Sequence, residues 1–123
     1  MRILIADDQK RTRQSLKLLL KTVPSGIEMR EAINGHEAVN MVREFLPDVV
    51  LMDARMPGMD GVEATRLIKA SWSGVKVIML SMYPEYLEAA FQAGVDAYIS
   101  KGQPPEELLE AICAMLSLSR SDE

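Results

Sequence analysis

The chain has 123 residues, and 48% of them are hydrophobic, which is enough for one domain with a core of its own. Its single cysteine excludes an internal disulfide framework, and its formal net charge of −4 argues against binding of a nucleic-acid backbone by this segment alone. No apolar stretch is long enough to span a membrane, and the paired aspartates come too early for a signal peptide. We therefore expect a cytoplasmic location, no membrane partner, and a buried thiol at Cys113.

Five short apolar runs alternate with helical patterns along the chain, which is typical of strand–helix units on a parallel sheet. The predicted strands comprise residues 2–6, 27–33, 48–52, 75–80 and 96–100. The second strand alternates apolar and charged residues, so we expect it at an edge of the sheet. The third strand is apolar on both faces and is expected at the centre. The pattern as a whole predicts an α/β fold.

Local start and stop signals accompany the first three predicted helices. The first helix spans about residues 11–22 and ends before a Pro-Ser-Gly sequence. The second begins at Asn34, which is expected to cap it, and the third begins at Asp60 in the same way. In the third helix, Leu67 and Ile68 are expected to face the core.

The last two helices also have recognisable ends. A helix over residues 84–93 is expected to stop at Gly94, and a final helix begins at Pro104-Pro105. The residues of the final helix that we expect to be buried are Leu108, Ile112, Met115 and Leu116. Residues 118–123 form a polar tail, which is either an end of the chain or the start of a linker.

Polar residues follow the predicted strands at their carboxyl ends, where ligands bind in open parallel sheets. Asp7 and Asp8 follow the first strand, Asp53 the third, Ser81 the fourth and Lys101 the fifth. If the first and third strands are neighbours, three carboxylates meet, and like charges about 4 Å apart cost roughly 4 kcal/mol at an effective dielectric near 20. A divalent cation would relieve this repulsion, and a few hard oxygen ligands favour Mg²⁺ over Ca²⁺.

These residue types suit phosphoryl transfer, which depends on positioning and charge neutralisation more than on covalent help from the protein. Asp53 would be the nucleophile. The metal and Lys101 would neutralise oxygens of the transferred group, and the Ser81 hydroxyl would donate a hydrogen bond to it.

At these positions the chain resembles the receiver domain of two-component response regulators, over essentially its whole length. The resemblance depends on four motifs in order along the chain: Asp7-Asp8, the stretch from Asp53 to Gly61, Leu80-Ser81, and the stretch from Tyr98 to Lys101. The sequence at residues 80–83 and 105–108 is most similar to receivers that precede a LuxR-type or NarL-like DNA-binding domain.

The resemblance implies a flavodoxin-like (βα)5 fold, in which a doubly wound, five-stranded parallel sheet has the order 2-1-3-4-5 and residues 1–117 form the receiver. It implies that Asp53 is the phosphoacceptor. The implied Mg²⁺ ligands are Asp7, Asp8, Asp53 and the backbone carbonyl of Arg55. Ser81 and Tyr98 would be the switch pair that remodels the face made by helix 4, strand 5 and helix 5.

The implied partner is a sensor histidine kinase, with a phosphorylation-dependent homodimer and with DNA contacted only through an output domain absent here. We expect a signalling phosphoacceptor that assists its own phosphorylation and dephosphorylation, not an enzyme. Ser81 and Lys101 are 20 positions apart, fewer than is usual in the family, and this keeps open a phosphorylation-independent interaction module. A Mg²⁺-dependent phosphohydrolase is a further alternative, although Arg55 stands where such enzymes have a second acid.

Overall fold

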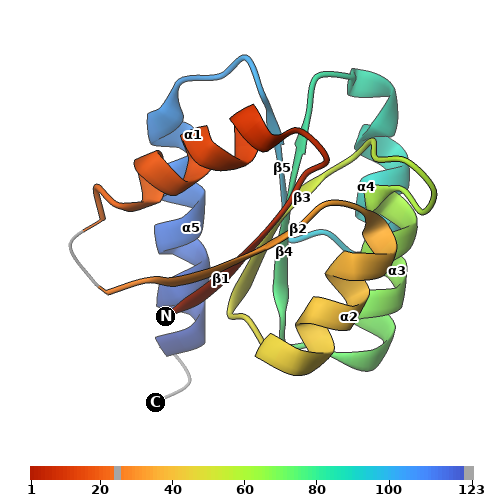
Figure 1. The fold of residues 1–123 in the computed structure, drawn as a ribbon, viewed down its shortest axis with the longest axis horizontal. Coiled ribbons are helices and arrows are strands. Elements are labelled where there is room, and N and C mark those ends of the chain that lie inside the picture. Colours follow the sequence, from red (N-terminus) through yellow and green to blue (C-terminus); the bar gives the residue numbers. More distant parts are fainter. Residues whose placement is uncertain (24–25, 121–123) are drawn as a thin grey trace.

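In the computed structural model, five parallel strands form one sheet in the order β2-β1-β3-β4-β5, with helices on both faces (Figure 1). The strands are β1 (Arg2–Ala6), β2 (Glu28–Ala32), β3 (Val49–Asp53), β4 (Lys76–Ser81) and β5 (Ala97–Ser100). The predicted flavodoxin-like (βα)5 fold and its strand order are confirmed. The structure describes residues 1–23 and 26–120, so most of the predicted break at residues 24–26 and the last part of the polar tail lie outside the described residues.

Two layers of helices enclose the sheet. The helices are α1 (Lys10–Leu20), α2 (Gly35–Phe45), α3 (Gly61–Ser71), α4 (Leu87–Ala93) and α5 (Pro105–Arg120). Helices α1 and α5 cover one face of the sheet, and α2, α3 and α4 cover the other (Figure 1). A short 3-10 turn, η1 (Pro84–Tyr86), precedes α4 and takes the place of the first turn predicted for that helix. Among the described residues, no helix has both the length and the apolar character to cross a membrane.

The two faces of the central strands contribute to two separate cores. Because side chains alternate along a strand, Leu4 and Val50 pack under the α2, α3 and α4 layer, whereas Ile3 and Leu51 pack under α1 and α5. All five residues of β3 are buried, as expected for a central strand. Strand β2 is half-exposed and lies at an edge of the sheet, as its alternating pattern predicts.

The predicted helix caps at Asn34, Asp60 and Gly94 agree with the structure, whereas α1 ends at Leu20, two residues before its predicted end. The Asn34 side chain accepts a hydrogen bond from the backbone N–H of Glu37 at 2.8 Å, and Asp60 accepts one from Glu63 at 2.9 Å. Gly94 ends α4 with φ +104°, a left-handed conformation that glycine adopts without steric cost. These contacts fix where α2 and α3 begin and where α4 ends.

Two burial predictions are wrong. Cys113 is exposed, because the buried residues of α5 are Leu108, Ile112 and Met115, and a helix turns by about 100° between Ile112 and the next residue. Leu67 is 40% exposed, because it lies about 100° around α3 from the buried Ile68. Leu116 is also predicted to be buried, but its side chain lies outside the part of the chain whose side chains the structure describes.

Candidate functional site

The carboxyl ends of β1, β3, β4 and β5 place their polar residues at one edge of the sheet. In the register of the sheet, Ala6 pairs with Met52, which puts Asp7 next to Asp53. The backbone N–H of Lys101 donates to the carbonyl oxygen of Ser81 at 2.9 Å, which ties the end of β5 to the end of β4. The topology therefore brings together the side chains that the sequence predicts at this edge.

Asp7, Asp8 and Asp53 form an acidic cluster. One carboxylate oxygen from each of these residues lies within 4.8 Å of the other two. Asp7 and Asp53 are buried, whereas Asp8 is exposed. Hard oxygen donors in this number suit a magnesium-sized cation that keeps some of its own water ligands. The donor set therefore fits the predicted metal, and an approaching cation has access from the Asp8 side.

Lys101 supplies the opposing charge. Its ammonium group lies 3.0 Å from an oxygen of Asp7 and 3.1 Å from an oxygen of Asp53. Burial raises the pKa of the Asp53 carboxyl above its ordinary value and the charge of Asp7 adds to this, while Lys101 acts in the opposite direction. Burial alone would lower the pKa of Lys101, but the two carboxylates together raise it. The ammonium thus remains charged and only partly neutralises the acids.

Backbone contacts hold the two buried acids in place. The N–H of Asp7 donates to the carbonyl of Ala32 at 3.0 Å, which extends the pairing of β1 with β2 by one residue. The Oδ1 atom of Asp7 accepts from the N–H of Gln9 at 2.9 Å. At the other buried acid, a Cβ atom on Gly61 would collide with the backbone carbonyl of Asp53. Only glycine therefore allows α3 to begin directly against the end of β3.

The hydroxyl groups of Ser81 and Tyr98 share one acceptor. Ser81 donates to the backbone carbonyl oxygen of Tyr83 at 3.0 Å and also accepts from the Tyr83 N–H at 2.9 Å. Tyr98 donates to the same carbonyl at 2.7 Å. The Arg55 guanidinium lies over the Tyr83 ring, 5.0 Å from its centroid. Tyr83 thus links both hydroxyl groups to the loop that follows the acidic cluster.

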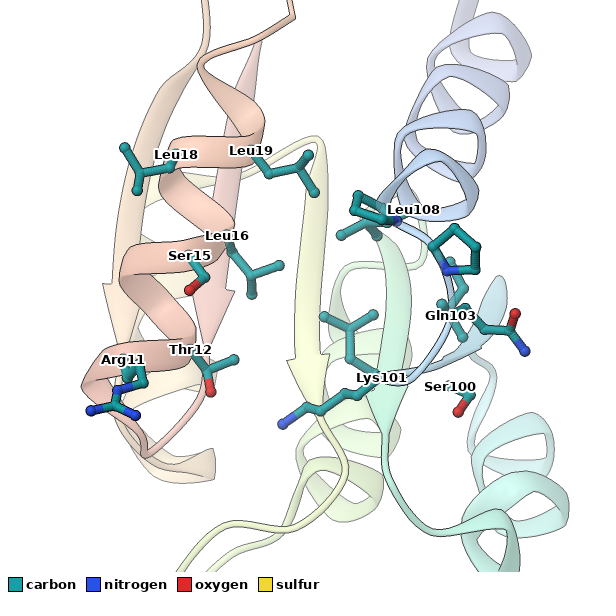
Figure 2. A pocket seen from close by; sticks show the side chains of 14 residues that line it. Arg11, Thr12, Ser15, Leu16, Leu18, Leu19, Ser100, Lys101, Gln103 and Leu108 are labelled. Atoms are coloured by element: carbon teal, nitrogen blue, oxygen red, sulfur yellow. The ribbon is translucent and has the colours of Figure 1, made fainter.

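Two cavities meet at Lys101. One, of about 690 Å³, contains the acidic cluster and is lined by Asp8, Asp53, Arg55 and Tyr83 among others. The second, of about 670 Å³, lies between α1 and α5 and is lined mainly by apolar side chains, as Figure 2 shows. Thr12 and Lys101 line both cavities, and the Lys101 ammonium contacts the acids.

The structure gathers Asp7, Asp8, Asp53 and Lys101 as the sequence predicts. Ser81 lies at the same edge, but its hydroxyl is engaged with the Tyr83 backbone. The roles of these side chains, and of the Arg55 carbonyl as a metal ligand, stay predictions. Sequence reasoning missed Arg13 and Glu31. Arg13 contacts Glu31 and also the backbone carbonyl of Asp7, in the loop of residues 7–9 that follows β1, here called the acidic loop.

The fold and the site agree with a known class of protein. The family model of the response regulator receiver domain matches residues 3–113, and the chain belongs to this family. The predicted family is therefore confirmed. Receiver domains of response regulators are signalling proteins, not typical enzymes.

The relatives include regulators of the LuxR family, the group that the sequence at residues 80–83 and 105–108 resembles most. The response regulator UvrY of Escherichia coli strain K12 is 39% identical over 120 residues, which make up 96% of this chain and 55% of UvrY. A LuxR-family response regulator from Aurantimonas sp. SI85-9A1 is 34% identical with a TM-score of 0.87, over 94% of this chain and 84% of that one. TrrA from Thermotoga maritima, solved in complex with Mg²⁺-BeF, is 32% identical with a TM-score of 0.84, over 93% and 97%. The chain spans about half the length of the curated relatives that it matches.

Proposed function

We propose that this domain accepts a phosphoryl group on Asp53 from a sensor histidine kinase, with Mg²⁺ bound by Asp7, Asp8, Asp53 and the Arg55 carbonyl. The observation that carries the proposal is the acidic cluster with a lysine ammonium 3.1 Å from Asp53. An Asp53 carboxylate oxygen would form the new bond to phosphorus as the bond from phosphorus to the histidine nitrogen breaks. The electron pair of that broken bond returns to the nitrogen.

The residues of the pocket would have different roles in phosphoryl transfer. Bound Mg²⁺ supplies positive charge against the acids and the incoming phosphoryl oxygens. Lys101 is already in contact with Asp53 and can neutralise one oxygen of the transferred group. The Gln9 N–H donates to the Asp7 carboxylate and so holds this proposed metal ligand in place. Preorganised charges of this kind supply most of the catalysis that phosphoryl transfer requires.

Ser81 and Tyr98 would act as the switch pair. Ser81 must give up its donation to the Tyr83 carbonyl in order to donate to a phosphoryl oxygen, since a hydroxyl has one proton. Tyr98 donates to that same carbonyl, so a movement of residue 83 changes its hydrogen bond as well. The shared acceptor couples the site to the face made by α4, β5 and α5. This face would control transcription through a DNA-binding output domain.

The kinase would meet α1 and the loops around Asp53, in a cytoplasmic location. Helix α1 begins next to the acidic cluster and presents Leu18 with 66% of its surface exposed. Such an apolar side chain with exposed lysine and arginine residues around it suits a helical partner surface. This support concerns the site of contact and does not name the kinase or its stimulus.

Phosphorylation would also promote a homodimer, and the charges of α1 and α5 favour a two-fold arrangement of these helices. Exposed residues on α1 or at its end are basic, and exposed residues on α5 are acidic: Lys10, Arg11 and Lys21, against Glu106, Glu107 and Glu110. In a two-fold interface each α1 would face the α5 of the other copy. Sedimentation velocity with and without a beryllofluoride phosphoryl mimic tests this, and unchanged sedimentation contradicts it.

The proposed reaction is tested by incubation with acetyl phosphate and Mg²⁺, followed by intact mass spectrometry. We expect one phosphoryl adduct, which is lost in the Asp53→Asn variant and when EDTA replaces Mg²⁺. Failure of the wild-type chain to gain the adduct would contradict the proposal and favour a phosphorylation-independent interaction module. Steady turnover of a phosphomonoester would favour the phosphohydrolase alternative instead.

A further inference from the structure

Arg13 connects the acidic loop to the edge strand of the sheet. Its Nη1 atom donates to the backbone carbonyl oxygen of Asp7 at 2.8 Å, and its Nε donates to the Glu31 carboxylate at 2.9 Å. Only 12% of the Arg13 side chain is exposed. Glu31 lies on β2 opposite Ile5 of β1, two residues before Asp7. The guanidinium thus joins α1, β2 and the end of β1 at one point.

The hydrogen bond from Arg13 to the Asp7 carbonyl also affects the position of Asp8. The carbonyl of Asp7 and the N–H of Asp8 belong to one planar peptide group, so a hydrogen bond to the carbonyl fixes the direction in which the chain enters Asp8. The N–H and both carboxylate oxygens of Asp7 already have partners of their own. Asp8 is exposed, and its carboxylate makes no hydrogen bond or ion pair with another described residue. Its placement therefore depends on the backbone before it.

Glu31 neutralises the positive charge of Arg13, which would otherwise repel a cation bound at the acidic cluster. An unpaired cation next to three carboxylates would repel a divalent metal ion. The ion pair with Glu31 neutralises Arg13 and also holds the plane of its guanidinium group, because two nitrogens of one rigid fork are engaged. Lys17 contacts the other oxygen of Glu31 at 3.0 Å but does not contact Asp7. Lys17 therefore pairs with Glu31, as Arg13 does, but only Arg13 also contacts the acidic loop.

We propose that Arg13, oriented by Glu31, is a positioning residue for the divalent cation: it fixes the peptide between Asp7 and Asp8, and with it the direction in which the Asp8 carboxylate faces the metal beside Asp7. The inference rests on the proposed function, since it assigns a role toward the metal of that site. Removing partners that orient metal ligands typically lowers metal affinity by about 10-fold to 100-fold. We expect a loss of this size when Arg13 or Glu31 is changed.

The experiment measures binding of Mn²⁺, which prefers the same oxygen ligands as Mg²⁺, from the electron paramagnetic resonance signal of the free ion. The variants are Arg13→Lys, which keeps the charge but loses the fork, and Glu31→Gln, which keeps the size but loses the charge. Lys17→Gln is the matched control, because it removes a partner of Glu31 without touching the acidic loop. Urea unfolding of each variant in EDTA reports stability separately from metal binding.

Arg13→Lys and Glu31→Gln should each bind Mn²⁺ about 10-fold or more weakly than the wild-type chain. Lys17→Gln should bind close to the wild-type value, whatever its effect on unfolding. Wild-type affinity in either of the first two variants would overturn the inference. So would an equal loss in Lys17→Gln, because Arg13 would then act only through the packing of α1 on β2. Absence of Mn²⁺ binding by the wild-type chain would instead overturn the proposed function.

Discussion

Replacing Asp53 by asparagine should stabilise the metal-free protein. At an effective dielectric of 20, the attraction between Asp53 and Lys101 at 3.1 Å is about 5 kcal/mol. The repulsion from each of the other two acids, at a separation of up to 4.8 Å, is about 3.5 kcal/mol or more in the same treatment, although the exposed Asp8 contributes less because water screens it. Attraction and repulsion nearly cancel, and burial adds a further cost to the charge. A neutral asparagine side chain removes this cost, so the free energy of unfolding should rise by roughly 1–2 kcal/mol at neutral pH.

The pH dependence of this gain follows from the raised pKa of Asp53, which burial causes first and the charge of Asp7 reinforces. A raised pKa means that the folded protein holds this proton more tightly than the unfolded chain does. The stability of the wild type therefore falls as the pH rises from the ordinary value of 3.8 through the raised value. The advantage of Asp53→Asn should be absent well below pH 3.8 and fully present above the raised pKa.

Urea unfolding followed by circular dichroism, in EDTA and over a series of pH values, measures both effects. Glu44→Gln, which changes an exposed acid outside the cluster, is the control for loss of one negative charge and should leave stability unchanged. Addition of Mg²⁺ should stabilise the wild type more than Asp53→Asn, because the variant lacks one of the ligands. A metal-free Asp53→Asn protein that is equally or less stable than the wild type at neutral pH would refute the electrostatic reasoning.

Three further substitutions test the framework around the site. Gly61→Ala should lower the free energy of unfolding by roughly 1–3 kcal/mol, because the added methyl group meets the backbone carbonyl of Asp53. Leu46→Asn should raise it by about 0.5–1 kcal/mol, since Leu46 ends α2 with φ 50° and asparagine tolerates that conformation better. Asp96→Ala should lower it by about 2–3 kcal/mol, because it removes contacts of 2.9 Å to the Lys69 ammonium and 2.8 Å to the Val77 N–H.

The same urea titrations measure these three changes, and each has an outcome that contradicts its reasoning. A Gly61→Ala protein with wild-type stability would mean that α3 can shift away from β3 without cost. No gain in Leu46→Asn would mean that the left-handed residue is not strained. Wild-type stability in Asp96→Ala would mean that the contacts of Asp96 to the Lys69 ammonium and to the Val77 N–H do not stabilise the fold.

Much of the fold could be predicted because its signals are local. The completely buried β3, the half-exposed β2 and the caps at Asn34 and Asp60 are each encoded within a few neighbouring residues. The acidic cluster could be predicted as well, since parallel strands end at a common edge and place Asp7 and Asp53 there. Periodicity and topology were sufficient for these features.

The errors and omissions concern information that is not local. Cys113 and Leu67 belong to helices with an apolar pattern, but the phase of a helix against the sheet decides which neighbour of a buried residue is exposed. Arg13 and Glu31 are 18 positions apart, and one sequence with many charged residues gives no signal that these two pair. The hydroxyl groups of Ser81 and Tyr98 both donate to the carbonyl of Tyr83. This acceptor is a backbone group, so the pattern of residue types gives no signal for it.

The most direct test of the central claim is to locate the phosphoryl group on the chain. After reaction with acetyl phosphate and Mg²⁺, hydride reduction converts an aspartyl phosphate to homoserine, which peptide mass spectrometry assigns to a residue. The account predicts homoserine at position 53 and at no other aspartate. Homoserine at position 7 or 8 in place of position 53, or none in a protein that binds Mg²⁺, would contradict it.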